Sequence, residues 1–345
     1  MYPEAASLPK TPTFASISGY LRFSRERSTI ISVKSIVIFL CSLPLALSAS
    51  YTVKDGNFVP SEYVTMESVQ DHYSALLDAY QKEEWKTVVR QGLVITKNFP
   101  DSFFADEALF YLGMSYFHIE EYDLANTMLT RYLKAQSMPK FFEQAMMTKF
   151  VMAKKFHEGA RTPLFGVKGF PKWVSAKDMA FELYEEVIAA LPQLDLCAEA
   201  LYGKGKWLLE SEKYQESLET FSSLIQRFPK HPLAVDAYLG IADVFLTQCQ
   251  KEYPDQDFLD LAEINVRRFS QDFPLEEKVV LAQAKFEEMK EIYAKKLYEI
   301  AQFYQRTKRY PAAAIYYQRL IHLYPQTHSA KSAKEMLAMK HFSEL

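Results

Sequence analysis

Five times in this chain a proline follows an aromatic residue or a leucine at the end of a stretch with helical character. The pairs are Phe99-Pro100, Leu191-Pro192, Phe228-Pro229, Phe273-Pro274 and Tyr324-Pro325. Proline has no amide hydrogen and disfavours helical geometry in the residue before it, so each pair predicts the end of a helix. The recurrence indicates that the chain is built from repeated helical units.

The composition favours an all-α protein with a large core. The 345 residues are 49% hydrophobic and include only 10 glycines, which is few for a turn-rich β structure. The 40 basic and 43 acidic side chains nearly balance, so the chain has no overall positive field to attract nucleic acid. We therefore expect a helical protein that does not bind nucleic acid.

A residue pattern repeats around three tyrosines, Tyr122, Tyr214 and Tyr310. Nine positions before each tyrosine stands a small residue, and seven positions after it stands a large apolar one. The small residues are Gly113, Gly205 and Ala301, and the large ones are Leu129, Phe221 and Tyr317. Small side chains let two antiparallel helices approach closely, and large ones fill the groove between neighbouring hairpins. Such hairpins bury their apolar faces by stacking into a superhelical solenoid with a concave and a convex side.

These residues resemble tetratricopeptide repeats (TPR), which have a period of about 34 residues. We expect a single solenoid over residues 66–345, with insertions at Gly159–Trp173 and around Gln250–Asp257. Its six hairpins are expected at 66–100, 103–138, 140–192, 196–229, 232–274 and 276–325, and a C-terminal capping helix at 328–342.

The segments Tyr73–Gln136 and Lys296–Ala330 are similar to the first and last repeats of the BamD-type outer-membrane assembly lipoproteins. The resemblance implies a non-enzymatic scaffold of the machinery that assembles outer-membrane β-barrel proteins. Its implied partners are the barrel insertase with its accessory subunits, through the C-terminal half, and unfolded outer-membrane proteins, through the N-terminal half. It also implies a position at the periplasmic face of the outer membrane, by peripheral association.

An alternative is a periplasmic TPR adaptor that coordinates envelope constriction or peptidoglycan synthesis. Such a protein would carry an N-terminal coiled coil, and no heptad pattern precedes Tyr73. A hydrolase that uses the solenoid as a support would need a separate catalytic domain, and no segment here is long enough to form one.

Residues 1–50 are expected to be a leader and signal peptide, followed by a short linker at 51–65. The apolar run Ile36–Leu47 is too short to span a bilayer, and small residues follow it, so we expect export with cleavage near Ala49 or Ser50. Residues before Val33 are unusual for a signal peptide, and translation starting at Val33 would give a compact one. The other interpretation of this leader, an organelle transit peptide, is disfavoured by Glu4 and Glu26.

Cys41 lies in the apolar run, where a bacterial lipoprotein carries its acylated cysteine. Phe39 and Leu40 stand where lipid attachment normally needs small residues, which argues against a lipid at Cys41. The other two cysteines, Cys197 and Cys249, are expected at opposite ends of equivalent helices, more than about 20 Å apart. Because a disulfide needs Cα atoms within about 7 Å, we expect two free thiols.

The motifs of common enzymes are missing from the chain. The sequence contains no His-Glu-x-x-His, no phosphate loop and no Gly-x-Ser-x-Gly elbow. His and Cys spacing gives no metal pattern. We therefore expect no enzymatic activity, no metal and no cofactor.

A candidate peptide-binding trough comes from the first two hairpins. One helical stripe in each hairpin lies away from the face that holds the small residues, and the two stripes could adjoin on the concave side. The candidate residues are Tyr73, Leu77, Tyr80, Phe110, Met114 and Phe117. An apolar trough of this kind suits an extended or amphipathic peptide. The alternative is that a tightly wound superhelix closes over these side chains.

Two further segments are candidates for partner contact. Under the resemblance to the BamD type, the basic edge formed by Arg306, Lys308 and Arg309 would dock the insertase. The insertion Gly159–Trp173 combines glycines with apolar residues, which either fold back on their own hairpin or contact a partner.

Overall fold

The computed structural model describes residues 51–54, 57–60, 68–163, 172–251 and 256–339. The chain divides into two units, Met1–Ser61 and Glu62–Leu345. The expectations for the leader, the signal peptide with cleavage near Ala49, the start at Val33 and the lipid at Cys41 lie outside the described residues.

A β-hairpin forms in the first unit, where a linker was expected. Strand β1 (Tyr51–Lys54) pairs antiparallel with β2 (Asn57–Pro60), and Lys54 stands opposite Asn57. The two residues between the strands are Asp55 and Gly56, a dipeptide that favours tight hairpin turns. The linker prediction for 51–65 overlooked this local signal.

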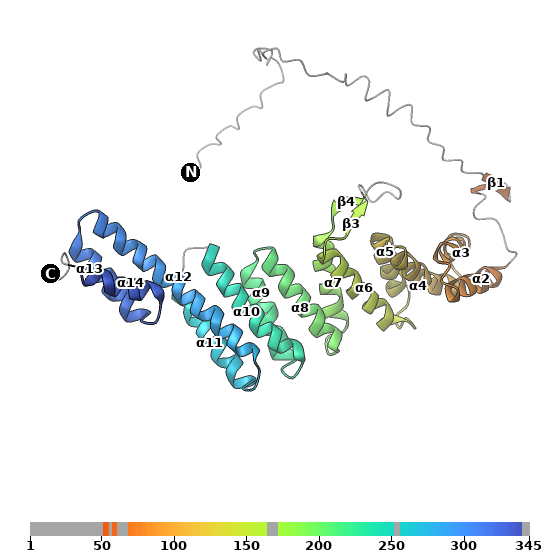
Figure 1. The fold of residues 1–345 in the computed structure, drawn as a ribbon. Coiled ribbons are helices and arrows are strands. Elements are labelled where there is room, and N and C mark those ends of the chain that lie inside the picture. The colour runs from red at the N-terminus through yellow and green to blue at the C-terminus, as the bar shows by residue number, and fades with distance from the viewer. Residues whose placement is uncertain (1–50, 55–56, 61–67, 164–171, 252–255, 340–345) are drawn as a thin grey trace, which may run out of the picture. The chain divides into compact units, whose positions relative to one another are not determined.

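The second unit is an array of helices that follow one another in chain order (Figure 1). The predicted all-α TPR-like solenoid is confirmed. The helices are α2 (Val69–Gln81), α3 (Trp85–Asn98), α4 (Phe103–His118), α5 (Tyr122–Ala135), α6 (Phe142–His157), α7 (Lys177–Ala190), α8 (Asp195–Glu210), α9 (Tyr214–Arg227), α10 (Pro232–Lys251), α11 (Gln256–Asp272), α12 (Lys278–Arg306), α13 (Tyr310–Leu323) and α14 (His328–Leu337).

Each of the six expected hairpin ranges contains one pair of consecutive helices, from α2 and α3 to α12 and α13, and α14 follows. The insertion between α6 and α7 differs from the expected loop, because its ends pair as strands. Strand β3 (Arg161–Pro163) runs antiparallel to β4 (Lys172–Ser175), with an irregular register at Thr162 and Pro163. Residues 164–171 between them are not described.

Helices end at the aromatic-proline and leucine-proline pairs, as predicted. The residues before four of the five prolines are C-caps with φ between −128° and −133° and ψ between 53° and 58°. These residues are Phe99, Leu191, Phe228 and Tyr324. Their backbone leaves the helical region one residue before the proline, as expected from the clash with the proline ring.

The turn inside a hairpin uses the same backbone conformation in four repeats. The residue two positions before Trp85, Tyr122, Tyr214 or Tyr310 has φ between 58° and 60°. These residues are Glu83, Glu120, Glu212 and Lys308. In each turn the next residue donates a backbone hydrogen bond five positions back, for example from Glu84 N–H to the Ala79 carbonyl at 2.9 Å. This is the Schellman arrangement, in which the left-handed position usually holds glycine.

We expect Glu83→Gly to stabilise the protein by about 0.5–1 kcal/mol, because glycine adopts the left-handed conformation without the strain imposed by a side chain. Chemical denaturation followed by circular dichroism measures the change. Lys86→Gly, an exposed position inside α3, is the control and should destabilise by about 1 kcal/mol. Equal changes for the two variants would contradict this prediction.

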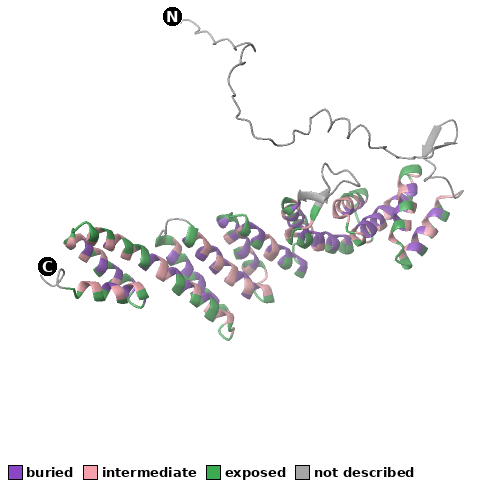
Figure 2. Ribbon diagram, turned by 45° about the horizontal axis from the view of Figure 1, so that its top comes forward, coloured by how far each residue is buried: buried purple, intermediate pink, exposed green. Residues whose placement is uncertain are grey.

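The small residues of the repeat make room for the large ones, as the spacing predicts. A Cβ atom built on Gly113 would lie 2.6 Å from the Leu129 side chain, and one built on Gly205 would lie 2.6 Å from the ring of Phe221. Phe221 also lies under Gly240 of the following hairpin, where a Cβ would approach its ring to 2.7 Å. One buried ring therefore packs against the backbones of two helices, α8 and α10. Figure 2 shows buried residues on the helix faces along the array.

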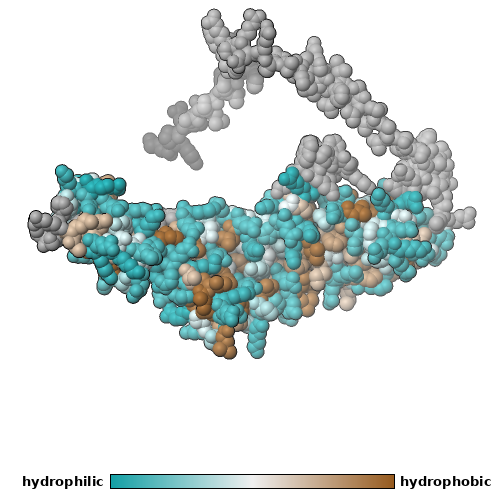
Figure 3. Space-filling view, in the orientation of Figure 1, coloured by the Kyte–Doolittle hydropathy of each residue, from teal (hydrophilic) through white to brown (hydrophobic). Residues whose placement is uncertain are grey.

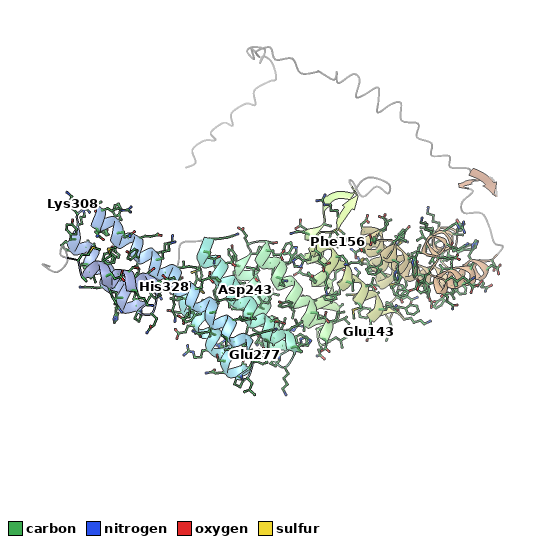
Figure 4. The ribbon with its side chains drawn as sticks, viewed as in Figure 1. Glu143, Phe156, Asp243, Glu277, Lys308 and His328 are labelled. Carbon is green, nitrogen blue, oxygen red and sulfur yellow. The ribbon has the colours of Figure 1, made fainter. Side chains whose placement is uncertain are left out.

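The first helices of successive hairpins also contact one another. Lys278 of α12 forms an ion pair with Asp236 of α10 at 2.6 Å, and Lys285 pairs with Asp243 at 2.5 Å. Both pairs are separated by the same number of residues, 42, so the two helices run parallel in register for two turns. Figure 4 labels Asp243 on α10.

A buried lysine connects three helices of the second and third hairpins. Lys149 of α6 is 1% exposed, and its Nζ donates hydrogen bonds to Asn126 Oδ1 at 2.9 Å and Thr130 Oγ1 at 2.7 Å on α5. It also forms an ion pair with Glu186 of α7. Burial lowers the pKa of Lys149 from its ordinary value, while Glu186 acts against this effect. The Lys149 ammonium group therefore connects α6 with α5 and α7.

The two cysteines of the array are free and buried. Cys197 lies in the first turn of α8 and Cys249 near the end of α10. Burial raises the pKa of both thiols. Each thiol therefore behaves as a small apolar core group.

Candidate functional site

A strip of half-buried aromatic rings crosses the first hairpins. Tyr73 and Tyr80 lie seven residues apart on α2, and Phe104 and Tyr111 lie seven apart on α4, so each pair shares one helix face. The ring of Tyr73 lies 4.7 Å from that of Phe104, and the ring of Tyr80 lies 4.9 Å from that of Tyr111. Phe141, just before α6, continues the strip at 6.0 Å from Tyr111. We call these five residues the aromatic strip.

The aromatic strip also carries hydrogen-bonding groups. The Tyr73 hydroxyl donates a hydrogen bond to Glu107 of α4. Burial and this bond raise the pKa of Tyr73, and burial raises the pKa of Tyr80 and Tyr111. The hydroxyls therefore stay protonated at neutral pH and remain hydrogen-bond donors. Rings with polar tips bind partners that present both apolar side chains and backbone carbonyls.

The structure divides the six residues expected to form the trough. Tyr73 and Tyr80 belong to the aromatic strip, and Leu77 between them is half-buried against the core of the first hairpins. Phe117 is half-buried and lies 5.8 Å from the ring of Tyr122 in its own hairpin. These four residues remain partly accessible.

Phe110 and Met114 are core residues, so the expectation that they line an accessible trough is wrong. Phe110 is 2% exposed and packs on Tyr132 and Phe141, with ring centroids 5.4 and 4.4 Å away. Met114 is 7% exposed, and its sulfur accepts a hydrogen bond from the Thr148 hydroxyl at 3.4 Å. The third hairpin covers both side chains, and this contact could not be deduced from the first two hairpins alone.

The predicted stripe on α4 passes through Phe110, one residue away from Tyr111 on the accessible face. Successive helix positions differ by about 100°, so a shift from Tyr111 to Phe110 moves the side chain from the strip into the core. One sequence signal could have found the correct face. Phe104 and Tyr111 repeat the spacing of seven that separates Tyr73 and Tyr80.

A cavity of about 610 Å³ lies farther along the array, between α6, α7, α8 and the start of α10. No residue spacing in the sequence predicted this cavity. Its lining mixes rings with charges and includes Phe150, Lys154, His157, Tyr184, Glu199, Tyr202, Lys206, Glu210 and His231. His157 lies at its wall. Its Nε2 is 3.2 Å from Glu210 Oε2 without a hydrogen bond, and its Nδ1 is 3.4 Å from the Tyr184 hydroxyl. The volume is in the range that accommodates small molecules or peptide side chains.

The basic edge expected at the last hairpin lies on the surface. Arg306, Lys308 and Arg309 are all exposed, and Lys308 occupies the left-handed position of the α12–α13 turn (Figure 4). In the part of the chain that the structure describes, none of the three forms an ion pair.

Apolar side chains are also exposed at the junction of α11 and α12. Leu275, Val280 and Leu281 are more than half exposed there, and Figure 3 shows apolar surface over this part of the array. Within the described residues there is no cluster of His, Cys, Asp or Glu suited to a metal ion. None of the helices in the described part combines the length and apolar character needed to cross a membrane.

Two models of known protein families match parts of the array. Residues 180–343, from α7 to α14, match the family model YfiO, described as an outer membrane lipoprotein. This part of the chain resembles the BamD-type lipoproteins. Residues 107–136, which cover most of α4 and α5, match a tetratricopeptide repeat model. The comparison with curated proteins found no match.

The BamD-type match includes the middle of the chain, where the residue pattern is weakest. It spans hairpins α8–α9 and α10–α11 as well as the last one, whose sequence carried the resemblance. Both families consist of scaffold and adaptor proteins. The match supports an association with the cell envelope and a role in outer-membrane assembly at the level of the family.

Proposed function

We propose that the chain is a non-enzymatic scaffold of the machinery that inserts β-barrel proteins into the outer membrane. It binds the barrel insertase with its accessory subunits and segments of unfolded outer-membrane proteins, at the periplasmic face of the outer membrane. The observation that carries this proposal is the match of α7–α14, part of a helical array, to an outer membrane lipoprotein family. The side chains of the described sites suit the binding of a partner, because they offer aromatic rings, hydroxyl groups and paired charges.

In this proposal the aromatic strip receives the unfolded segments. Strands of a β-barrel alternate apolar and polar residues, so an unfolded strand presents aromatic and aliphatic side chains every second position. The half-buried tyrosine rings offer such side chains a rigid apolar surface, and the Tyr80 hydroxyl donates to a carbonyl group of the extended backbone. The spacing of two helix turns within each helix suits an elongated ligand.

The double variant Tyr80→Ala and Tyr111→Ala tests this assignment. We expect it to weaken the binding of synthetic peptides from barrel strands by about tenfold or more, because aromatic anchors carry much of the affinity at interfaces. Calorimetry or fluorescence anisotropy measures the affinity. The control is Tyr304→Ala with Tyr316→Ala, which removes a stacked tyrosine pair in the last hairpin with ring centroids 5.4 Å apart.

The control variant should keep its affinity for the peptides within about twofold, and circular dichroism should show that both variants keep their helices. Equal losses of affinity in both variants, or unchanged affinity in the first, would contradict the assignment of the aromatic strip as the binding surface.

Affinity purification from envelope membranes tests the scaffold role separately. Recovery of a barrel insertase supports it, whereas recovery of cell-wall synthases in its place contradicts it.

A further inference from the structure

The last hairpin and the capping helix carry mainly basic charge. Between residues 300 and 339 there is one acidic residue, Glu335, although the whole chain has a net charge of −3. The basic residues in this segment are Arg306, Lys308, Arg309, Arg319, Lys331 and Lys334. All six are exposed. This end of the array therefore presents a positive field to an anionic surface.

The contacts inside the last hairpin show which of its faces is free. The rings of Tyr304 on α12 and Tyr316 on α13 stack across the hairpin at 5.4 Å and 13°. One residue later in each helix, the hydroxyl of Tyr317, which is fully buried, donates to Gln305 Oε1 at 2.7 Å. The residues after the stacked pair therefore mark the buried face of the hairpin.

The residues before the stacked pair mark the opposite face. A helix turns about 100° per residue, and the two helices are antiparallel, so Phe303 and Ile315 project together on the side away from Tyr317. Phe303 is 54% exposed and Ile315 is 63% exposed, as this placement requires. Arg306 follows Phe303 by three positions and Arg319 follows Ile315 by four, so both arginines share this face. We call Phe303, Arg306, Ile315 and Arg319 the outer face of the last hairpin.

The outer face continues into a small depression of about 190 Å³. Lys296 and Ile300 of α12 line it together with Arg319 and Leu323 of α13. Glu299 Oε2 lies 3.9 Å from Lys296 Nζ, and both side chains are half exposed. The surface thus carries separate apolar side chains bordered by cations, and this depression is smaller than the clefts that hold peptide or small-molecule ligands.

We propose that the outer face, with Lys308 and Arg309 of the adjoining turn, binds the headgroup layer of an anionic phospholipid membrane. Basic residues near such a surface are attracted to its negative potential, and isolated apolar side chains insert at the headgroup boundary. A shallow surface fits a lipid layer better than a protein, whose side chains need deeper pockets as anchors. The match to an outer membrane lipoprotein family places a membrane within reach of the chain. The contact goes beyond the proposed scaffold role and does not depend on peptide binding by the aromatic strip.

Co-sedimentation of the full chain with vesicles tests the proposal. We expect binding to vesicles of phosphatidylcholine mixed with phosphatidylglycerol, loss of that binding in high salt, and little binding to phosphatidylcholine alone. The triple variant Arg306→Gln, Lys308→Gln and Arg309→Gln should weaken the partitioning by about 100-fold. Phe303→Ala with Ile315→Ala should weaken it by about tenfold, since two inserting side chains are lost.

The matched control is Lys82→Gln, Lys86→Gln and Arg90→Gln, which removes the same charge from exposed positions of the first hairpin. It should change the partitioning by no more than about threefold. Equal effects of the two triple variants would overturn the proposal, and so would equal binding to both kinds of vesicle. One further result would overturn the proposal: the full chain does not bind vesicles, and the Arg306, Lys308 and Arg309 variant loses binding to the purified insertase. The surface would then dock an acidic protein.

Discussion

Replacing Phe221 with alanine is expected to lower the free energy of unfolding by about 3–5 kcal/mol. Phe221 is fully buried, and its ring lies against the backbones of Gly205 in α8 and Gly240 in α10. The shorter side chain would leave a cavity between two hairpins, because three helices would have to move together to close it. Urea denaturation of the full chain, followed by circular dichroism, measures the loss.

Phe303→Ala is the control for this prediction. It removes the same side chain from a surface position, so we expect a change within about 0.5 kcal/mol. The glycines provide a second check, because Gly205→Ala should cost about 1–3 kcal/mol through overpacking against the Phe221 ring. A loss below about 1 kcal/mol for Phe221→Ala would show that the junction collapses freely, contrary to this account.

Glu186→Ala is expected to destabilise the protein by about 2–3 kcal/mol at neutral pH. Without Glu186, the buried Lys149 ammonium group would have hydrogen bonds only to the neutral oxygens of Asn126 and Thr130. The expected loss of unfolding free energy is smaller than for a fully buried ion pair, because the Glu186 side chain is 46% exposed. Urea denaturation at several pH values measures this loss and its pH dependence.

The pH dependence distinguishes a buried charge from a surface ion pair. Burial already lowers the pKa of Lys149 in the folded protein, and loss of Glu186 removes the group that opposes this shift. The unfolded chain then binds a proton more tightly than the folded one, so the stability of the variant should rise as the pH increases from 7 toward the ordinary lysine pKa of about 10.4. The wild-type protein should show a smaller rise.

Glu185→Ala provides the neighbouring control. Glu185 pairs with Lys204 at 2.8 Å, and its own side chain is about half exposed, so we expect a loss of at most about 1 kcal/mol and little dependence on pH. If the two variants lost the same stability and responded alike to pH, the Lys149 network would have no special role.

The repeat pattern was predictable because it rests on local chemistry and short spacings. Proline ended the helices at Phe99, Leu191 and Phe228, as its missing amide and its ring require. The pairing of Gly205 with Phe221 was predictable for a similar reason, since both residues belong to one hairpin and meet wherever two antiparallel helices cross closely.

The candidate site was predictable only in part. Tyr73 and Tyr80 lie on a partly open face of α2, and their role in binding stays a prediction, whereas Phe110 and Met114 lie in the core. Their burial comes from the third hairpin, through contacts such as the stacking of Phe141 on Phe110. The cavity beside His157 was missed because four helices contribute to its walls, and no spacing within one hairpin reports on it.

The helical repeats and the small-to-large contacts within a hairpin could be predicted from the sequence. These properties depend on residues within about 35 positions of one another. Which helix faces stay open could be learned only from the packed array, because burial depends on the next hairpin in the stack. The same is true of the last hairpin, where Tyr317 is buried while Phe303 and Ile315 are exposed on the other side of the stacked Tyr304 and Tyr316.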